Sequence, residues 1–402
     1  MTFRYKGGVI SATAPTITPP TLGEGGSASG VWTLEQQFQN AGNWPQPILP
    51  KQLWIWGSNT YGQLGLGNTS YYSSPKQVGS LTDWSQISSG YYHTVATKID
   101  GTLWAWGRSD VGQLGLGNRV NYSSPMQVGV LTNWLQVSAG YQSTLAIKTD
   151  GTLWAWGLNA QGRLGLGNIT NYSSPKQVGA LTTWYKIVTS VSSTFSIKTD
   201  GTLWGWGYNN YGQLGLGNTS NYSSPKQIGS LTNWLEIACG TYQAIAIKTD
   251  GTLWSWGRND FGQLGLGNIT NYSSPKQVGA LTNWLQVSSG FYHASAIKKN
   301  GTIWSWGRNK YGELGLGDII YRSSPTQIGS LTTWYKISGS SYYSMSIKTN
   351  GTLWGWGQNP SGNLGIGNSI NQSNPVQIGA LTTWASLSKI PSSLTTAALK
   401  TA

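Results

Sequence analysis

The chain has 402 residues, of which 9% are charged and 12% are aromatic, and it contains 55 glycines and 23 tryptophans. This composition excludes general disorder, because the chain has ample apolar surface to bury. The formal net charge of +13 favours anionic partners such as nucleic acid, lipid headgroups or acidic polysaccharide. The first residues, MTFRYKGGVI, hold no apolar signal-peptide core, and no stretch approaches the ~18 apolar residues of a membrane span. We therefore expect neither secretion by a signal peptide nor membrane insertion.

The first fifty residues differ in character from the rest of the chain. Residues 1–29 include SATAPTITPPTLGEGGSASG, which is rich in Pro, Gly, Ser and Thr and predicts an extended arm. Residues 30–50 are interpreted as a short helix and a tether, because Thr33 is a candidate N-cap in TLEQQFQNAG. A helix this short needs a docking partner, which is either the rest of this chain or another protein. The predicted docking side chains are Trp32, Leu34, Phe38 and Trp44.

The stretch from GGVISATAPTI to GVWTLEQQFQNAGNWP resembles the leaders of structural proteins of tailed phages, especially marine phages. In those proteins such a stretch precedes varied C-terminal domains on tail fibres and other virion components. The resemblance implies a modular protein, in which the arm engages the phage particle and the remaining chain is displayed.

After the leader the sequence repeats itself every fifty residues. Each unit contains three tryptophans and four short β-like runs, such as TLWAW, PKQVG, WLQVS and TLAIKTDG. The Asp-Gly or Asn-Gly pair that ends most units predicts a hairpin into the next unit. The run GQLGLGN is too rich in glycine for a regular strand and predicts a tight, packed turn. The seven units begin at Lys51, Gly101, Gly151, Gly201, Gly251, Gly301 and Gly351.

Seven units of four strands predict an all-β, seven-bladed β-propeller over residues 51–402. One blade cannot bury both of its faces, whereas a closed ring of blades can. The two tryptophans of TLWAW share one face of their strand and are expected to form the core between blades. The chain stops where the next TLWAW would begin. We therefore predict that Ala397–Lys400 pairs with Leu53–Trp56, which closes the ring and removes exposed strand edges.

The runs AWGRSDVGQLGLGN, SSPMQVG and VSAGYQSTLAIKTDG resemble the regulator of chromosome condensation repeat in their spacing, their glycines and the closing Asp-Gly. The resemblance covers the chain from Lys51 to its end and implies a seven-bladed propeller. Family members act as exchange factors for a small GTPase or as an inhibitor of a bacterial β-lactamase, so the resemblance also implies protein binding. The family commonly has a histidine at the start of the last strand of the unit. Here that column reads His93, Ser143, Ser193, Gln243, His293 and Tyr343.

No catalytic, metal-binding or cofactor-binding group is predicted, and we do not expect an enzyme. The aspartates of the Asp-Gly pairs have an obvious turn role. His93 and His293 are four units apart, which places them on nearly opposite sides of a seven-fold ring. GQLGLGN follows a strand without opening a helix, so it is not interpreted as a phosphate-binding loop. Cys239 is the only cysteine and is interpreted as a small packed residue.

Binding is the better prospect, because positions that differ between units are free for a partner. These positions follow WG, follow GLGN, or start the last strand of the unit, and Tyr and Arg dominate them. Neutral drift after duplication is the alternative explanation. Repeated lysines such as Lys148 and Lys176 are expected to be solvated. The predicted ligand-binding residues are Tyr61, Tyr71, Tyr72, Tyr92, His93, Arg108, Arg119, Tyr208, Tyr211, Arg258, Phe261, Tyr292, His293, Arg308, Tyr311, Tyr321 and Arg322.

Two functional hypotheses follow from these observations. In the first, the chain is a phage virion protein, such as a tail fibre, an adhesin or a surface decoration. Residues 1–50 would bind other virion proteins, and the propeller would bind a host-surface receptor or polysaccharide, with acidic polysaccharide suiting the positive charge. In the second, the propeller binds a protein, as an exchange factor or inhibitor does. A nucleic-acid role is disfavoured because the sequence shows no basic tail or Lys/Arg cluster.

Overall fold

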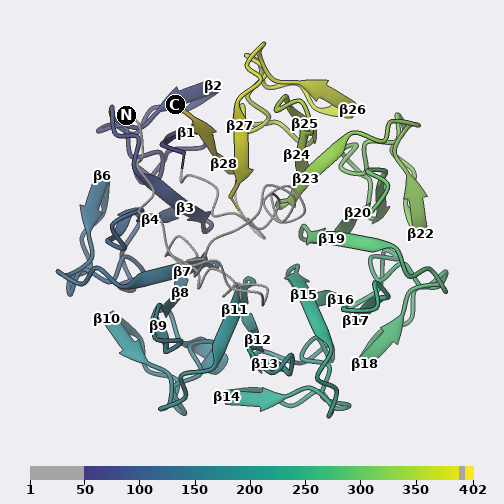
Figure 1. Cartoon of the computed structure of the whole chain (residues 1–402), viewed down its shortest axis with the longest axis horizontal. Helices are drawn as coiled ribbons and strands as arrows, with labels where there is room; N and C mark the ends of the chain where they lie inside the picture. Colours follow the sequence, from purple (N-terminus) through teal and green to yellow (C-terminus); the bar gives the residue numbers. More distant parts are fainter. Residues whose placement is uncertain (1–48, 389–393) are drawn as a thin grey trace, which may run out of the picture. The chain divides into compact units, whose positions relative to one another are not determined.

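The computed structural model describes residues 49–388 and 394–402. Seven four-stranded antiparallel sheets are arranged as blades around a central axis (Figure 1). The predicted fold class, an all-β seven-bladed propeller, is confirmed. The ring belongs to a compact unit that spans Pro50–Ala402. In the described part of the chain the single helical element is the 3-10 turn η2, Ala160–Gly162. The predicted arm and short helix lie outside the described residues.

Each blade contains one strand of each of four kinds, in a fixed order from the axis outward (Figure 1). The innermost strands are β3 (Trp84–Ser89), β7 (Trp134–Ala139), β11 (Trp184–Thr189), β15 (Trp234–Cys239), β19 (Trp284–Ser289), β23 (Trp334–Gly339) and β27 (Trp384–Leu387). The second strands are β4 (His93–Lys98), β8 (Ser143–Lys148), β12 (Ser193–Lys198), β16 (Gln243–Lys248), β20 (His293–Lys298), β24 (Tyr343–Lys348) and β28 (Thr395–Thr401). The third strands are β1 (Lys51–Gly57), β5 (Leu103–Gly107), β9 (Leu153–Gly157), β13 (Leu203–Gly207), β17 (Leu253–Gly257), β21 (Ile303–Gly307) and β25 (Leu353–Gly357). The outermost strands are β2 (Tyr72–Gln77), β6 (Tyr122–Gln127), β10 (Tyr172–Gln177), β14 (Tyr222–Gln227), β18 (Tyr272–Gln277), β22 (Arg322–Gln327) and β26 (Gln372–Gln377).

Blade 1 closes the ring by combining strands from both ends of the ring-forming segment. Its strand order from the axis outward is β27, β28, β1, β2. Each other blade consists of four consecutive strands, so blades 2 to 7 contain, in turn, β3–β6, β7–β10, β11–β14, β15–β18, β19–β22 and β23–β26. Leu53 pairs with Leu399 and Trp56 pairs with Thr396, within a seven-residue antiparallel ladder between β1 and β28. The predicted pairing of the two terminal strands is therefore confirmed.

The second tryptophan of each unit joins neighbouring blades. Trp106 in β5 is fully buried, and its indole Nε1 donates a 2.9 Å hydrogen bond to the main-chain carbonyl of Gln63 in the preceding blade. The equivalent bond occurs at the other six junctions, at 2.8 to 3.1 Å. Leu103 and Ala105 point the opposite way and pack against Trp156 of the next blade. Burial of such an indole removes ~150–250 Å² from water, which stabilises the ring by about 4–6 kcal/mol as an upper value.

The glycines of the GLG run allow this indole to approach the preceding loop. Gly115 has a φ of +75°, a backbone region that side chains other than glycine rarely adopt. A Cβ atom at Gly115 would lie 2.7 Å from Nε1 of Trp156, well inside van der Waals contact. The predicted tight turn therefore serves the junction between blades, because it brings the loop backbone against the indole.

The repeated lysines form two groups that differ in burial, a difference that the sequence does not reveal. Lys148 is only 6% exposed, and its ammonium lies 3.9 Å from the ring centre of Trp154 and 4.9 Å from that of Trp134. Burial lowers the pKa of Lys148, and the nearby Asp150 opposes this effect. Lys176, on the outermost strand β10, is exposed. The prediction of a solvated lysine is thus wrong for Lys148 and its equivalents and correct for Lys176.

Candidate functional site

In blades 2 to 7, two loops lie side by side at the same end of the blade. The connection from the first to the second strand and the connection from the third to the fourth strand lie at the same end, because adjacent strands are antiparallel. In blade 2 these are residues 90–92 and 108–121, joined by a 2.9 Å hydrogen bond from the amide of Arg108 to the carbonyl of Tyr92. We call this end of the ring the aromatic face, and the opposite end, which carries the Asp-Gly and Asn-Gly turns, the hairpin face.

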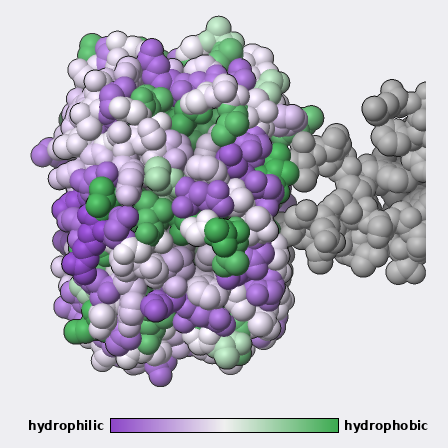
Figure 2. All heavy atoms as spheres, turned by 90° about the vertical axis from the view of Figure 1, so that its left-hand side faces the viewer, coloured by the Kyte–Doolittle hydropathy of each residue, from purple (hydrophilic) through white to green (hydrophobic). Residues whose placement is uncertain are grey.

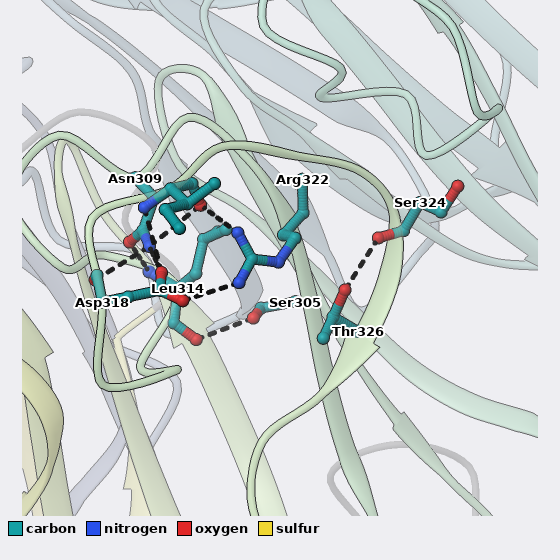
Figure 3. Close-up of polar contacts among 8 residues, drawn as sticks. Ser305, Asn309, Leu314, Asp318, Arg322, Ser324 and Thr326 are labelled. Atoms are coloured by element: carbon teal, nitrogen blue, oxygen red, sulfur yellow. Dashed lines mark hydrogen bonds and ion pairs between the residues drawn. The ribbon is translucent and has the colours of Figure 1, made fainter.

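The long loop between the third and fourth strands is internally braced. In blade 6 the side-chain amide of Asn309 donates to the carbonyl of Asp318 at 3.0 Å and accepts from the amide of Leu314 at 3.0 Å (Figure 3). Ser305 adds a 2.7 Å bond from its hydroxyl to the carbonyl of Leu314. In blades 1, 3, 4, 5 and 7 the equivalent asparagine accepts the same bond from the leucine amide. Side chains on this loop are therefore presented from a fixed backbone.

A first cluster of aromatic residues and arginine spans blades 1 to 3 on the aromatic face. Ring centres lie 4.9 Å apart for Tyr61 and Tyr92, 4.3 Å apart for Tyr91 and Tyr92, and 4.8 Å apart for Tyr91 and Tyr141. The guanidinium carbon of Arg108 lies 4.9 Å from the ring centre of Tyr61 and 5.4 Å from that of Tyr92. Residues that are far apart in the sequence thus form one contact network across blade junctions.

A second cluster begins at blade 4 and continues through blade 5. Tyr208 and Tyr211, on the long loop of blade 4, both contact Tyr242, with ring centres 5.9 Å and 4.9 Å away. Arg258 is the centre of this group, because its guanidinium lies 4.9 Å from the ring of Tyr211, 5.6 Å from Tyr242 and 5.4 Å from Tyr292. One arginine therefore joins three successive blades.

The second cluster extends through blades 6 and 7. Tyr292 contacts Phe261 with a ring-centre distance of 5.2 Å and Tyr342 with one of 6.4 Å. Arg308 lies 5.1 Å from the ring of Tyr311 and 4.6 Å from that of Tyr342. Two further rings complete the cluster, with Phe291 against Tyr342 at 5.2 Å and Tyr321 against Phe261 at 5.7 Å.

The three arginines of these clusters are held by acidic side chains of their own loops. Arg108 and Arg258 each bind the aspartate two residues later at 2.6 Å. Arg308 lies 3.6 Å from the carboxylate of Glu313, and burial raises the pKa of Glu313. The guanidinium groups are thereby fixed in position and largely neutralised. These three arginines therefore add little free positive charge to the aromatic face.

Three tyrosines of the clusters, Tyr92, Tyr242 and Tyr342, have raised pKa values. Burial, followed by the neighbouring Tyr91, raises the pKa of Tyr92 to about 12. Burial also raises the pKa of Tyr242 and Tyr342. Half-buried phenols that are packed against each other lose little side-chain freedom on binding, which suits them as contact residues.

His93 and His293, which the sequence suggests as ligand-binding residues, are not available on this surface. Both are buried, with 1% of the residue exposed. Nε2 of His93 lies 2.9 Å from the hydroxyl of Thr144 in the next blade. That hydroxyl itself donates to the carbonyl of Gln113 at 2.7 Å, so the histidine must be the donor. Nδ1 of His93 has no partner, and burial lowers the pKa of both histidines to about 3, with Arg308 adding to the effect at His293.

The column that contains these histidines bridges neighbouring blades with different side chains. Gln243 donates 3.1 Å bonds to the hydroxyl of Ser289 and to the carbonyl of Gly290 in the next blade. Tyr343 bonds to the hydroxyl of Thr396 at 2.8 Å in blade 1. Variation within a column therefore does not by itself mark a binding position, because different residues perform the same structural task here.

Four other predicted residues lie outside the two clusters. Tyr71 is exposed and shares a hydrogen bond with the hydroxyl of Thr60 on its own loop. Tyr72 accepts a bond from Asn68, as the equivalent tyrosines of blades 2 to 5 do from theirs, so it belongs to the scaffold. Arg119 is exposed at a loop tip. Arg322 binds Asp318 at 2.6 Å within its own loop (Figure 3).

The remaining predicted residues belong to the two clusters: Tyr61, Tyr92, Arg108, Tyr208, Tyr211, Arg258, Phe261, Tyr292, Arg308, Tyr311 and Tyr321. Five cluster members were not selected as site residues: Tyr91, Tyr141, Tyr242, Phe291 and Tyr342. They lie on the short loops just before the second strands, within the varying columns. The pattern of variation contained them, but one sequence does not show which of those columns face solvent.

Residues 49–388 and 394–402 also bear on two other kinds of site. They contain no group of three or more His, Cys, Asp or Glu side chains that could hold a metal ion. No helix in these residues has the length and apolar character needed to cross a membrane. The contact network of the aromatic face is the feature that most resembles a binding surface.

Sequence comparison matches the chain to one repeat family. The profile of the regulator of chromosome condensation (RCC1) repeat matches residues 52–97, 100–147, 150–197, 200–247, 250–297, 300–347 and 350–388. A second profile of the same repeat matches five ranges that overlap these, between residues 84 and 313. No curated protein sequence matches the chain significantly.

Many solved structures have a similar fold, and three of them are the following. Yeast RCC1 (Prp20), in a crystal structure with Kap60, is 20% identical, with a TM-score of 0.79 over 88% of this chain and 89% of that one. Human WBSCR16 is 19% identical, with a TM-score of 0.78 over 88% of this chain and 99% of that one. Prp20p from Saccharomyces cerevisiae, a structure described together with its binding to Gsp1p and histones, is 21% identical, with a TM-score of 0.76 over 88% and 92%.

Proposed function

The chain belongs to the regulator of chromosome condensation (RCC1) repeat family, and from this premise we propose that it is a non-enzymatic propeller that binds a protein through its aromatic face. Two of the similar solved structures concern protein binding, by yeast RCC1 to Kap60 and by Prp20p to Gsp1p and histones. At 20 to 21% identity these structures indicate a shared fold and do not identify the partner of this chain. The partner must therefore be inferred from the surface of this chain.

The observation that carries the proposal is that residues which differ between the seven units contact one another in two clusters. The hairpin face repeats the same turns from blade to blade, whereas the aromatic face carries a different combination of Tyr, Phe and Arg in each blade. Such residues dominate the energetics of protein interfaces. A surface that differs from blade to blade suits a partner that is not itself repetitive, and a folded protein is such a partner.

The second cluster is the better candidate for the centre of the interface. It covers four blades, and Arg258 and Arg308 hold its rings in fixed positions. Since these guanidinium groups are already paired with acidic side chains, the surface offers phenol hydroxyls and ring faces rather than free charge. We expect a partner that inserts apolar side chains between the rings and presents hydrogen-bond acceptors to the hydroxyls.

The double variant Tyr242→Ser, Tyr292→Ser is expected to weaken partner binding by about 1,000-fold, because truncation of two hot-spot residues costs ~2 kcal/mol each. The matched control is Tyr185→Ser, Tyr335→Ser, which removes two exposed tyrosines from the innermost strands β11 and β23. Partners are identified by cross-linking and mass spectrometry, and the dissociation constant of each purified partner is then measured with the three proteins. Equal affinities for all three would refute the aromatic face as the interface.

A second candidate role rests on the leader. We propose that the propeller is displayed on a phage virion, with Trp32, Leu34, Phe38 and Trp44 docking on other virion proteins and the ring facing a host-surface receptor or polysaccharide. The support is the resemblance of GVWTLEQQFQNAGNWP to phage structural proteins. Mass spectrometry of purified particles tests the proposal, and absence of the protein from them defeats it. The first proposal does not depend on this outcome.

A further inference from the structure

The outer wall of the ring carries equivalent grooves between neighbouring blades. Three of them have the same lining, at the junctions of blades 3 and 4, blades 5 and 6, and blades 7 and 1. The first two have volumes of about 340 Å³ and the third about 510 Å³, within the range of small-ligand sites. Each is lined by the end of one outermost strand and by the tryptophans and the outermost strand of the next blade.

The groove between blades 5 and 6 shows which residues make up this lining. Gln277 and Leu281 come from the end of β18 and the turn that follows it. Trp284 from β19, Trp304 from β21 and Pro325 from β22 line it from the next blade. The grooves between blades 3 and 4 and between blades 7 and 1 have the same types of residue at the same positions of the repeat.

Two residue positions of the groove are largely exposed and yet identical in every unit. The leucine of the GxLT turn occurs in all seven units, although it is 41 to 50% exposed in each of them. The glutamine of the PxQ run also occurs in all seven units and is exposed in five of them. On the outer wall, apolar atoms lie in separate patches bordered by hydrophilic ones (Figure 2). Core packing does not account for a half-exposed leucine that never varies.

Other exposed positions of the same repeat vary freely. The residue after GLGN, GLGD or GIGN is Thr69, Arg119 and Ile169 in the first three units, and Thr, Ile, Ile and Ser in the next four. Exposure alone therefore allows change in this chain. The constancy of the groove leucine and glutamine indicates a task that every junction performs, in contrast to the varied aromatic face.

The chemistry of the lining suits a sugar. Trp304 presents a half-buried indole to the groove, and indole surfaces are apolar platforms for the C–H face of a pyranose ring. The side-chain amide of Gln277 donates to the main-chain carbonyl of Gly279 at 3.1 Å, which leaves its oxygen to accept from a sugar, and the hydroxyl of Ser324 is a second polar group of the lining. The ammonium of Lys298 also lines the groove and lies over the ring of Trp304, 3.6 Å from its centre, so a sugar would stack on the part of the indole that this ammonium leaves uncovered. The linings of the three grooves include no carboxylate, so an acidic sugar meets no repulsion there.

We propose that these grooves are carbohydrate subsites that together bind a polysaccharide of repeating units. Each pyranose would stack on the exposed part of the tryptophan, with its hydroxyls bonded to the glutamine and serine. Identical sites at regular spacing around a ring match a ligand that repeats, because several weak contacts add up by effective concentration. This function is independent of protein binding by the aromatic face, which uses different residues at the end of the ring.

The test uses the full chain and a microarray that displays neutral and uronic-acid-containing polysaccharides. The unaltered protein is expected to bind a subset of these, and the strongest is then immobilised for affinity measurement. The groove variant changes seven leucines to serine, at Leu81, Leu131, Leu181, Leu231, Leu281, Leu331 and Leu381. It is expected to bind at least about tenfold more weakly, since every subsite is impaired at once. The control removes exposed aliphatic side chains elsewhere by the changes Val120→Ser, Ile169→Ser, Ile269→Ser, Ile319→Ser and Ile370→Ser.

Two further variants keep the result decisive. If the leucine variant does not fold, the exposed glutamines Gln127, Gln177, Gln227, Gln277 and Gln377 are changed to alanine instead, with the same expected loss. The aromatic-face variant Tyr242→Ser, Tyr292→Ser is expected to retain full polysaccharide binding. The proposal is overturned if no polysaccharide binds the unaltered protein, if a folded groove variant binds as well as the control, or if the aromatic-face variant alone loses binding.

Discussion

Removal of residues 395–402 is expected to prevent the chain from forming a stable ring. These residues include β28, which lies between β1 and β27 in blade 1. Its Ala397, Ala398 and Leu399 are completely buried, and its ladder with β1 is seven residues long. Without it, β1 exposes the buried Leu53 and Ile55 on an open strand edge, which also promotes aggregation. The loss is comparable with the whole net stability of a folded domain, about 5–15 kcal/mol.

The measurement is thermal unfolding followed by tryptophan fluorescence, together with size-exclusion chromatography. A shorter truncation that removes only Thr401 and Ala402 serves as the control, because it leaves the buried part of β28 in place. The control is expected to unfold cooperatively near the temperature of the full chain. If the protein that lacks residues 395–402 is monomeric and has an unchanged unfolding temperature, the ring does not need this closure.

Acidification is expected to destabilise the ring through His93 and His293, well above the pH at which carboxylates are protonated. Burial lowers the pKa of each histidine to about 3, whereas an unfolded histidine titrates near 6.5. The unfolded state therefore binds more protons between these values, so this part of the stability is present above pH 6.5 and is lost as the pH falls toward 3. At pH 5 the expected loss is about 2 kcal/mol for each histidine.

The physical cause lies in the hydrogen-bond arrangement around each ring. Nε2 of His93 already donates to Thr144, and protonation would place a second N–H at Nδ1, which is buried without a partner. The same arrangement holds for His293 with Ser344, whose hydroxyl donates to the carbonyl of Glu313. The hairpin aspartates, such as Asp100, have lowered pKa values. Their contribution to the free energy of unfolding is therefore lost only when the pH falls below the usual pKa of an aspartate.

The double variant His93→Gln, His293→Gln is expected to remove most of the loss of stability between pH 7.5 and pH 5. Glutamine is chosen because Gln243 occupies the same column and bridges to the next blade without a titratable group. Urea unfolding at the two pH values provides the free energies of unfolding. If the double variant loses as much stability as the unaltered chain over this interval, the histidines are not responsible.

Strand positions, turn positions and blade count could be predicted because they depend on local patterns that occur seven times. The alternation in TLWAW, the Asp-Gly turns and the glycines of GQLGLGN each specify backbone geometry within a few residues. The pairing of Leu53–Trp56 with Ala397–Lys400 followed from the phase of the repeat, and the register bears it out. The candidate site was predicted only in part, since His93 varies between units and is nevertheless a buried bridge.

The sequence by itself therefore determined the all-β ring, its seven blades and its closure, because hydrophobic alternation and turn chemistry act over a few residues. Only the tertiary structure decided which varied residues meet. Tyr211 and Arg258 are neighbours because their loops lie at adjacent blade junctions on the same end of the ring. Lys148 is buried for a related reason, since the tryptophans that enclose it come from the first and third strands of its blade. The lysine contact needs the strands of one blade to pair, whereas the contact of Tyr211 with Arg258 exists only once two blades have packed against each other in the ring.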